Sequence, residues 1–296
     1  MKVELLDFKE LDNYPSGSGI EFYDDKVFVV GETAGDLLVM NKKWKKPERI
    51  PLFAPGQQGA AAPPADLEAM TLLTIDKKPH LLIIGSGAVP ARSKAVLLNL
   101  KTRLAIGSTA GTTVTDLSVF YDRIKSSGIP VLNMEGIASV YDYLVMVHRG
   151  NESNPDNYLI ITKPGFWNDQ QNAPLQMVKI DFGARAVKGM GISGITYSDD
   201  HEDLFLTITT EPGEGNASGK SWLGVIENLY RKIGREKVRM KVNELIDLTA
   251  ADKRFDGYAF EAVCIQSEKD HSMKLQLVAD NAAGQSCLFK VELQDL

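Results

Sequence analysis

Five short segments of this 296-residue chain share one pattern: a Ser or Glu, then a Gly or Ala, then a larger apolar residue. The five leading residues are Ser18, Glu68, Glu135, Ser193 and Glu261. Three carboxylates held close together would repel one another and would not all stay ionised without a compensating charge. A divalent cation would supply that charge. Oxygen ligands without His or Cys favour a hard ion such as Ca²⁺, which accepts about six to eight oxygens.

The same five residues allow a second interpretation. The acids could share protons or pair with a basic side chain and hold no metal, and the alternation of Ser and Glu could come from drift between repeats. Five equivalent polar positions are harder to attribute to drift than one. We therefore expect Ca²⁺ as the cofactor, with these five residues as its ligands.

The repeats also predict the fold. They recur at intervals of about 50 to 70 residues, and each is followed by a polar turn and two further apolar runs. That length accommodates a four-stranded antiparallel blade with its loops. The small residue after the polar position would let neighbouring strands approach closely around a central channel. The sequence thus predicts an all-β protein, a five-bladed β-propeller forming a single domain over residues 1–296, with six blades as the alternative.

The two ends of the chain suggest how the ring closes. The last repeat has three strand-like runs, whereas residues 2–8 form a run that belongs to no repeat. We expect this run to pair with the outer edge of the last blade, because closure leaves only short exposed edges.

One segment interrupts the strands. Leu117, Phe120 and Ile124 follow helical spacing, with Thr115 or Asp116 as a cap, so we expect one short helix over residues 115–127, inserted between blades two and three. The charged residues 228–242 fit either a short helix or a hairpin. Three Gly-, Pro- and Asn-containing stretches are predicted surface connections: residues 55–64, 151–156 and 212–219.

Charge and composition exclude several partners. The net charge of −6 and the pI near 5.4 argue against nucleic acid, which requires a basic surface. The basic cluster Lys42–Lys46 contains Trp44, which could stack on a base, but its position between two strand-like runs favours a solvated hairpin tip. No apolar run approaches the roughly 18 residues of a membrane span, so no membrane partner is expected.

The N-terminus and the cysteine usage favour a cytoplasmic location. No signal peptide is seen at the start of the sequence, although a trimmed secreted chain would look the same. Cys264 and Cys287 lie in apolar runs without a CxxC motif, which predicts two buried thiols. The four histidines are scattered, which argues against zinc. The sequence predicts no particular protein partner.

A rim of polar residues is expected above the proposed ion, because the start of each innermost strand and the end of the next lie at one face of a propeller. In the predicted roles, Arg149 binds an anionic small molecule, and Glu32 or Glu211 activates water while the ion polarises a phosphoryl or carbonyl oxygen. The predicted substrate-binding residues are Ser86, His148, Asp280 and Asn281. The alternative is that these polar side chains only keep the face hydrated.

The order Ser, Glu, Glu, Ser, Glu on five successive inner strands resembles the calcium-activated nucleotidases (apyrases). The likeness covers most of the chain as repeat spacing, and includes Gly191–Ile195 and the acids after Ser198. It implies a five-bladed propeller whose central Ca²⁺ is held by that set of residues, with a nucleotide at the channel mouth.

The chain departs from that family at the rim. The segment Gly31–Gly35 keeps the acid Glu32 and a Gly but lacks the family's arginine, and Gly85–Val89 lacks its basic residue. Arg149 matches a family arginine, and Glu211 falls near a family acid. The departures favour a substrate other than a nucleotide.

Two functions follow from these residues. One is a metal-dependent hydrolase of a phosphate ester or another small anionic substrate at the channel mouth, with a lactonase or esterase as a variant. The other is a non-enzymatic binding or scaffold propeller whose central ion is structural. The sequence contains no GxSxG or GxxxxGK[ST] motif to suggest other chemistry.

Overall fold

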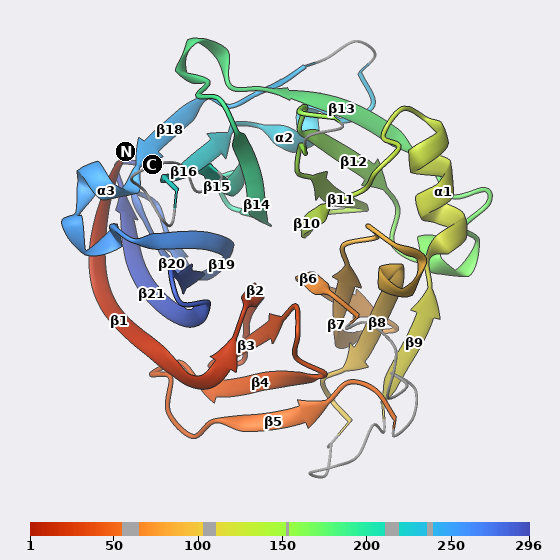
Figure 1. Ribbon diagram of the computed structural model, residues 1–296, viewed down its shortest axis with the longest axis horizontal. Helices are drawn as coiled ribbons and strands as arrows, with labels where there is room; N and C mark the ends of the chain where they lie inside the picture. Colours follow the sequence, from red (N-terminus) through yellow and green to blue (C-terminus); the bar gives the residue numbers. More distant parts are fainter. Residues whose placement is uncertain (55–64, 103–110, 152–153, 211–218, 236–238) are drawn as a thin grey trace.

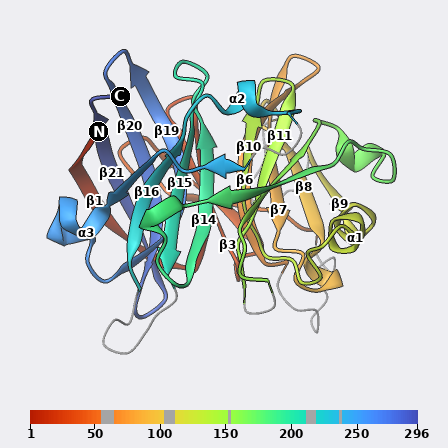
Figure 2. The ribbon, with the colours of Figure 1, turned by 90° about the horizontal axis from the view of Figure 1, so that it is seen from above.

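Five sheets surround a central channel in the computed structural model, which describes residues 1–54, 65–102, 111–151, 154–210, 219–235 and 239–296 (Figure 1). Each blade has four antiparallel strands, and one of the five sheets carries a further short parallel strand at its edge. The predicted five-bladed β-propeller is therefore confirmed, and the alternative of six blades is wrong. The innermost strands of the blades face one another across the channel, and Figure 2 shows the ring from the side.

Within each blade the strands follow one another outwards from the channel, and β1 forms the outer edge of the fifth blade. Blade one contains β2 (Gly17–Tyr23), β3 (Lys26–Gly31), β4 (Asp36–Asn41) and β5 (Glu48–Pro51). Blade two contains β6 (Leu67–Ile75), β7 (Lys78–Gly85), β8 (Lys94–Asn99) and β9 (Thr112–Asp116). Blade three contains β10 (Met134–Val140), β11 (Tyr143–His148), β12 (Tyr158–Thr162) and β13 (Gln176–Asp181), with β17 (Met240–Lys241) added in parallel at its edge. Blade four contains β14 (Met190–Tyr197), β15 (Leu204–Thr210), β16 (Ser221–Ile226) and β18 (Glu244–Asp247). Blade five contains β19 (Tyr258–Lys269), β20 (Ser272–Asn281), β21 (Gln285–Gln294) and β1 (Lys2–Pro15).

The core lies between blades, which explains why the second strand of a blade is apolar on both faces. In β7, Leu82 and Ile84 join a cluster shared with blade three, whereas Leu81 and Ile83 join one shared with blade one. All four are fully buried. Because side chains alternate between the two faces of a strand, one apolar run supplies both interfaces.

The ring is closed by the N-terminal strand, as predicted. β1 pairs antiparallel with the outer strand β21, from Lys2 opposite Gln294 to Pro15 opposite Gln285. The two chain ends consequently lie close together (Figure 1). The first strand and the last three complete one blade, so β1 covers the outer edge of β21 and holds the two ends of the chain in the same sheet.

The helices differ in part from the prediction. α1 (Ser118–Ser126) is shorter than residues 115–127, because Thr115 and Asp116 end β9 and Leu117 precedes the helix. The Asp116 carboxylate accepts the Ser118 N–H, while Leu117, Phe120 and Ile124 are buried. The described residues contain two more α-helices. α2 (Leu229–Lys232) lies in the stretch 228–242, for which a short helix was one of the two alternatives, whereas α3 (Leu248–Ala251) was not predicted. Short 3₁₀ turns span Pro90–Arg92, Phe166–Asn168, Gly183–Arg185 and Lys253–Phe255.

Several smaller expectations have different outcomes. The segment Lys42–Lys46 connects β4 to β5, and its Trp44 is buried, so the hairpin interpretation holds and no base can stack there. Both cysteines are free and buried. The predicted loops 55–64, 151–156 and 212–219 lie wholly or partly outside the described residues. In the part of the chain that is described, no helix has the length and hydropathy needed to cross a membrane.

Candidate carboxylate site at the channel mouth

All five repeated residues occupy β-bulges at equivalent points of the innermost strands. The pairing of each innermost strand with its neighbour shifts register at Ser18, Glu68, Glu135, Ser193 and Glu261. A bulge inserts one unpaired residue and redirects a side chain, and such features are common beside functional sites. The repeated positions found in the sequence therefore coincide with a repeated backbone irregularity, which the sequence analysis did not predict.

Where the residue after the bulge is glycine, close packing between blades leaves little room for a side chain. A Cβ on Gly194 would lie 2.7 Å from the Glu261 carbonyl oxygen, and one on Gly136 would lie 3.1 Å from the Ile195 nitrogen. Innermost strands of adjacent blades thus approach backbone to backbone, as the repeat predicted.

The two serines of the set connect neighbouring blades. The Ser18 hydroxyl donates to the Leu67 carbonyl of blade two, and the Ser193 hydroxyl donates to the Phe260 carbonyl of blade five, each at 2.5 Å. In both cases the acceptor residue directly precedes a Glu of the set, so each serine fixes the strand that carries the next carboxylate.

Two of the three glutamates face Arg149, which follows β11. The Arg149 Nη1 atom lies 3.8 Å from Glu135 Oε1 and 3.9 Å from Glu261 Oε2. The Asn133 amide also donates to Glu135 Oε1, at 2.5 Å. Arg149 reaches this position across Gly191, where a Cβ would lie 2.4 Å from its Nε. The guanidinium therefore lies between two blades' carboxylates.

The third glutamate belongs to a different acidic group. One carboxylate oxygen from each of Glu32, Asp66 and Glu68 lies within 4.8 Å of the other two. Glu68 is buried on β6, Asp66 is two residues before it, and Glu32 follows β3 of the neighbouring blade. Among the described residues, this is the group of acids, His or Cys whose spacing could suit a metal ion.

Asp66 was missed by the sequence analysis. Its Oδ2 accepts a hydrogen bond from the buried Ser86 hydroxyl at 2.5 Å and lies 2.9 Å from Arg92 Nη1. The signal available in the sequence was its place two residues before a repeated Glu. Asp66 also adopts a positive φ of 52°, an uncommon backbone conformation that recurs at functional sites.

Burial and mutual repulsion raise the carboxyl pKa values at this end of the channel. Burial, with the charges of Glu135 and Glu32 as lesser causes, raises the pKa of Glu68 well above its usual range. Burial and neighbouring acids raise the pKa of Glu32 to about 7. Burial raises the pKa of Glu261 to about 8 although Arg149 acts in the opposite direction, and burial raises the pKa of Asp280 to about 6. Without a further cation, several of these groups hold protons near neutral pH.

The remaining predicted rim residues have varied surroundings. His148 is fully buried, its Nδ1 accepts the Asn133 N–H, and burial lowers its pKa to about 4. Ser86 is buried and bonded to Asp66. The Asn281 side chain accepts the N–H groups of Ala283 and Gln285, which stabilises the turn before β21. Glu211 lies outside the described residues.

Comparison with solved structures supports the fold alone. Glutaminyl cyclase from Myxococcus xanthus is 11% identical, with a TM-score of 0.56 over 99% of this chain and 97% of that one. An exo-1,5-α-L-arabinanase from a bovine ruminal metagenomic library is 10% identical, with a TM-score of 0.49 over 96% and 94% of the two chains. An α-L-arabinofuranosidase from Clostridium thermocellum is 11% identical, with a TM-score of 0.47 over 90% and 82%.

The sequence comparisons reach a family. No curated protein matches the chain. A family described as "Family of unknown function (DUF6929)" matches residues 13–293, which is nearly the whole propeller from the end of the closing strand to the last strand. On that match, the chain belongs to the DUF6929 family.

Proposed function

We propose that this propeller binds one Ca²⁺ ion at the channel mouth, through Glu68 together with Glu32 and Asp66. The observation that carries the proposal is the mutual spacing of their oxygens, within 4.8 Å. Calcium–oxygen distances are about 2.3–2.6 Å, so ligands around one ion lie no more than about 5 Å apart. The donor set is made of oxygen alone, which suits a hard cation.

The charge balance supports the same proposal. Six carboxyl groups gather near this end: Glu32, Asp66, Glu68, Glu135, Glu261 and Asp280. The basic groups contacting them, among the described residues, are Arg92 on Asp66 and Arg149 on Glu135 and Glu261. A divalent cation beside Glu68 would balance negative charge that these two arginines leave uncompensated. Of the five ligands predicted from the sequence, this proposal keeps Glu68 as a direct ligand. Glu135 and Glu261 contact Arg149 instead.

The activity that suits this arrangement is metal-dependent hydrolysis of a phosphate ester or another small anionic substrate. The ion would polarise the substrate's oxygen, Arg149 would attract its negative charge, and Glu32 would accept a proton from water. The Ser and Glu order shared with the calcium-activated nucleotidases supports this assignment, and the missing basic residues favour a non-nucleotide substrate.

A structural ion is the second candidate, favoured by the contacts of Arg149. Its guanidinium already faces Glu135 and Glu261, and Glu68 is almost fully buried. An ion there would stabilise the ring, because it would relieve the repulsion among carboxylates that belong to different blades.

The metal proposal is tested on the full chain by elemental analysis and by thermal unfolding with Ca²⁺ or EDTA. We expect about one bound Ca²⁺ per chain and a lower Tm in EDTA, with both effects lost in Glu68→Gln and kept in the control Glu48→Gln, an exposed acid on β5. Equal Tm values with and without calcium, or unchanged binding in Glu68→Gln, would refute the site.

The activity is tested separately, with calcium-loaded protein and a panel of sugar phosphates, inositol phosphates, nucleotides and lactones. The hydrolase is supported if the wild type turns over a panel member and Arg149→Met loses this turnover while it still binds calcium. Calcium-dependent stability without turnover of any panel member supports the structural ion.

A further inference from the structure

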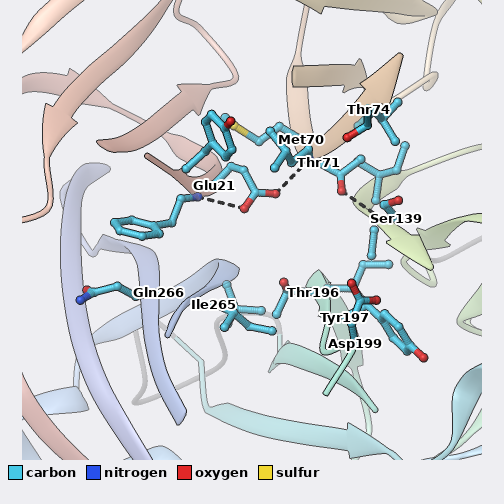
Figure 3. Close-up of a pocket in the computed structure, with 18 of the residues that line it drawn as sticks. Glu21, Met70, Thr71, Thr74, Ser139, Thr196, Tyr197, Asp199, Ile265 and Gln266 are labelled. Atoms are coloured by element: carbon cyan, nitrogen blue, oxygen red, sulfur yellow. Dashed lines mark hydrogen bonds between the residues drawn. The ribbon is translucent and has the colours of Figure 1, made fainter. Parts of the chain in front are cut away.

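A separate cavity opens at the opposite end of the channel. Its volume is about 700 Å³, within the range of about 300–1,000 Å³ typical of small-molecule sites. Residues of all five innermost strands line it, from β2, β6, β10, β14 and β19 (Figure 3). Glu21 is three residues beyond Ser18, which along a strand is about 10 Å from the bulge. The cavity is therefore distinct from the carboxylate site at the mouth.

The carboxylate of Glu21 points into this cavity and is held in place by backbone donors. Its Oε1 accepts the Phe22 N–H at 2.9 Å, and its Oε2 accepts the Leu72 N–H of the neighbouring blade at 3.2 Å (Figure 3). Both donors are neutral, so the bonds orient the carboxylate without cancelling its charge. Burial raises the pKa of Glu21 to about 7, and no basic side chain contributes to that value.

The other charged residues that line the cavity are all acidic. Asp24, Asp199 and Glu268 add negative charge, and the described residues that line the cavity include no Lys, Arg or His. Between the acids lie apolar side chains, Met70, Ile137, Ile195 and Ile265, with Tyr23 and Tyr141 among the aromatic rings. A site with an oriented carboxylate, an apolar wall and aromatic rings favours a cation that carries hydrocarbon.

We propose that this cavity binds a small organic amine, whose ammonium group pairs with Glu21 and whose apolar part lies against Met70 and Ile265. Hydroxyl groups of Thr71 and Thr196 face the same space and can accept further ammonium N–H bonds (Figure 3). An anion is disfavoured there, because it would meet only acids, and a purely apolar ligand would leave Glu21 without a counter-charge.

The test uses three probes of similar shape and different charge: phenethylamine, 2-phenylethanol and phenylacetate. Binding to the full chain is measured by isothermal titration calorimetry at pH 8 in excess Ca²⁺, so that the channel mouth is occupied by metal. We expect phenethylamine to bind at least about tenfold more tightly than either of the other probes, a difference of about 1.4 kcal/mol.

Variants locate the binding. Glu21→Gln removes the charge and should weaken phenethylamine binding at least about tenfold, whereas Glu68→Gln and the exposed control Glu48→Gln should not change it. If Glu21→Gln does not fold, Thr196→Phe fills the cavity and should abolish binding while leaving the Ca²⁺-dependent Tm unchanged.

Three results would overturn the proposal: similar affinity for all three probes, phenethylamine binding that survives both Glu21→Gln and Thr196→Phe, or binding that is lost only in Glu68→Gln. The last result would place the amine at the channel mouth. Failure of the calcium proposal would leave the comparison of the three probes and of Glu21→Gln unaffected, because Glu21 and Glu68 lie at opposite ends of the channel.

Discussion

Replacing Glu21 by Gln should change the pH dependence of stability in a defined direction. Burial raises the pKa of this carboxyl from 4.5 to about 7. The folded protein therefore keeps a proton that the unfolded chain loses above about pH 4.5, and stability falls as the pH rises from about 4.5 to about 7. At about 1.4 kcal/mol for each pH unit between the two pKa values, this difference corresponds to at most about 3.5 kcal/mol, and to less because solvent reaches the partly exposed carboxylate.

Glutamine changes two terms of opposite sign. The N–H groups of Phe22 and Leu72 bond to different oxygens of Glu21, and glutamine has an NH2 group in place of one of them. One N–H therefore loses its acceptor, which costs about 1–3 kcal/mol at every pH. Glutamine also removes the penalty for a buried negative charge, which matters only where Glu21 is ionised. Relative to the wild type, Glu21→Gln should therefore be least stable at pH 5 and recover by about 2–3 kcal/mol at pH 8.

The assay is urea unfolding followed by tryptophan fluorescence, at pH 5 and pH 8, for the wild type, Glu21→Gln and the exposed control Glu48→Gln. Comparing each variant with the wild type cancels the titration of the acids at the channel mouth. A difference between Glu21→Gln and the wild type that stays constant from pH 5 to pH 8, within about 0.5 kcal/mol, would refute the reasoning.

Three further substitutions test the packing of the ring. Ser18→Ala removes the hydroxyl bond to the Leu67 carbonyl and should cost about 1–2 kcal/mol in urea unfolding; no loss would show that the bond between blades is dispensable. Gly191→Ala places a Cβ 2.4 Å from Arg149 Nε and 2.7 Å from its Cγ and should destabilise by about 1–3 kcal/mol, a cost that should shrink when Arg149 is already Ala; equal costs in both backgrounds would contradict the contact. Trp44→Phe leaves the buried Gln276 side chain without its 2.6 Å donor and should cost about 1–3 kcal/mol, whereas an unchanged Tm would mean that water replaces the indole.

The sequence alone determined the architecture. A repeated Ser or Glu with a following small residue counted the blades, and apolar runs such as Leu81–Ile84 identified strands packed between blades. These features are local and recur five times, so each repeat reinforces the same interpretation. The spare N-terminal run, paired with the three strands of the last repeat, was enough to predict how the ring closes.

Only the tertiary structure decided which charged side chains each of the three repeated glutamates contacts. The sequence treated Glu68, Glu135 and Glu261 as equivalent, because their repeats are equivalent. In the folded ring, Arg149 extends over Gly191 to face two of them, and Asp66 and Glu32 approach the third. Such contacts join residues far apart in the chain and depend on side chains that lie outside the repeated positions. The cavity around Glu21 has the same origin, since its walls come from the far ends of five strands. A periodic pattern can fix the backbone of a propeller, but the charges that meet in its channel are set by residues that break the pattern.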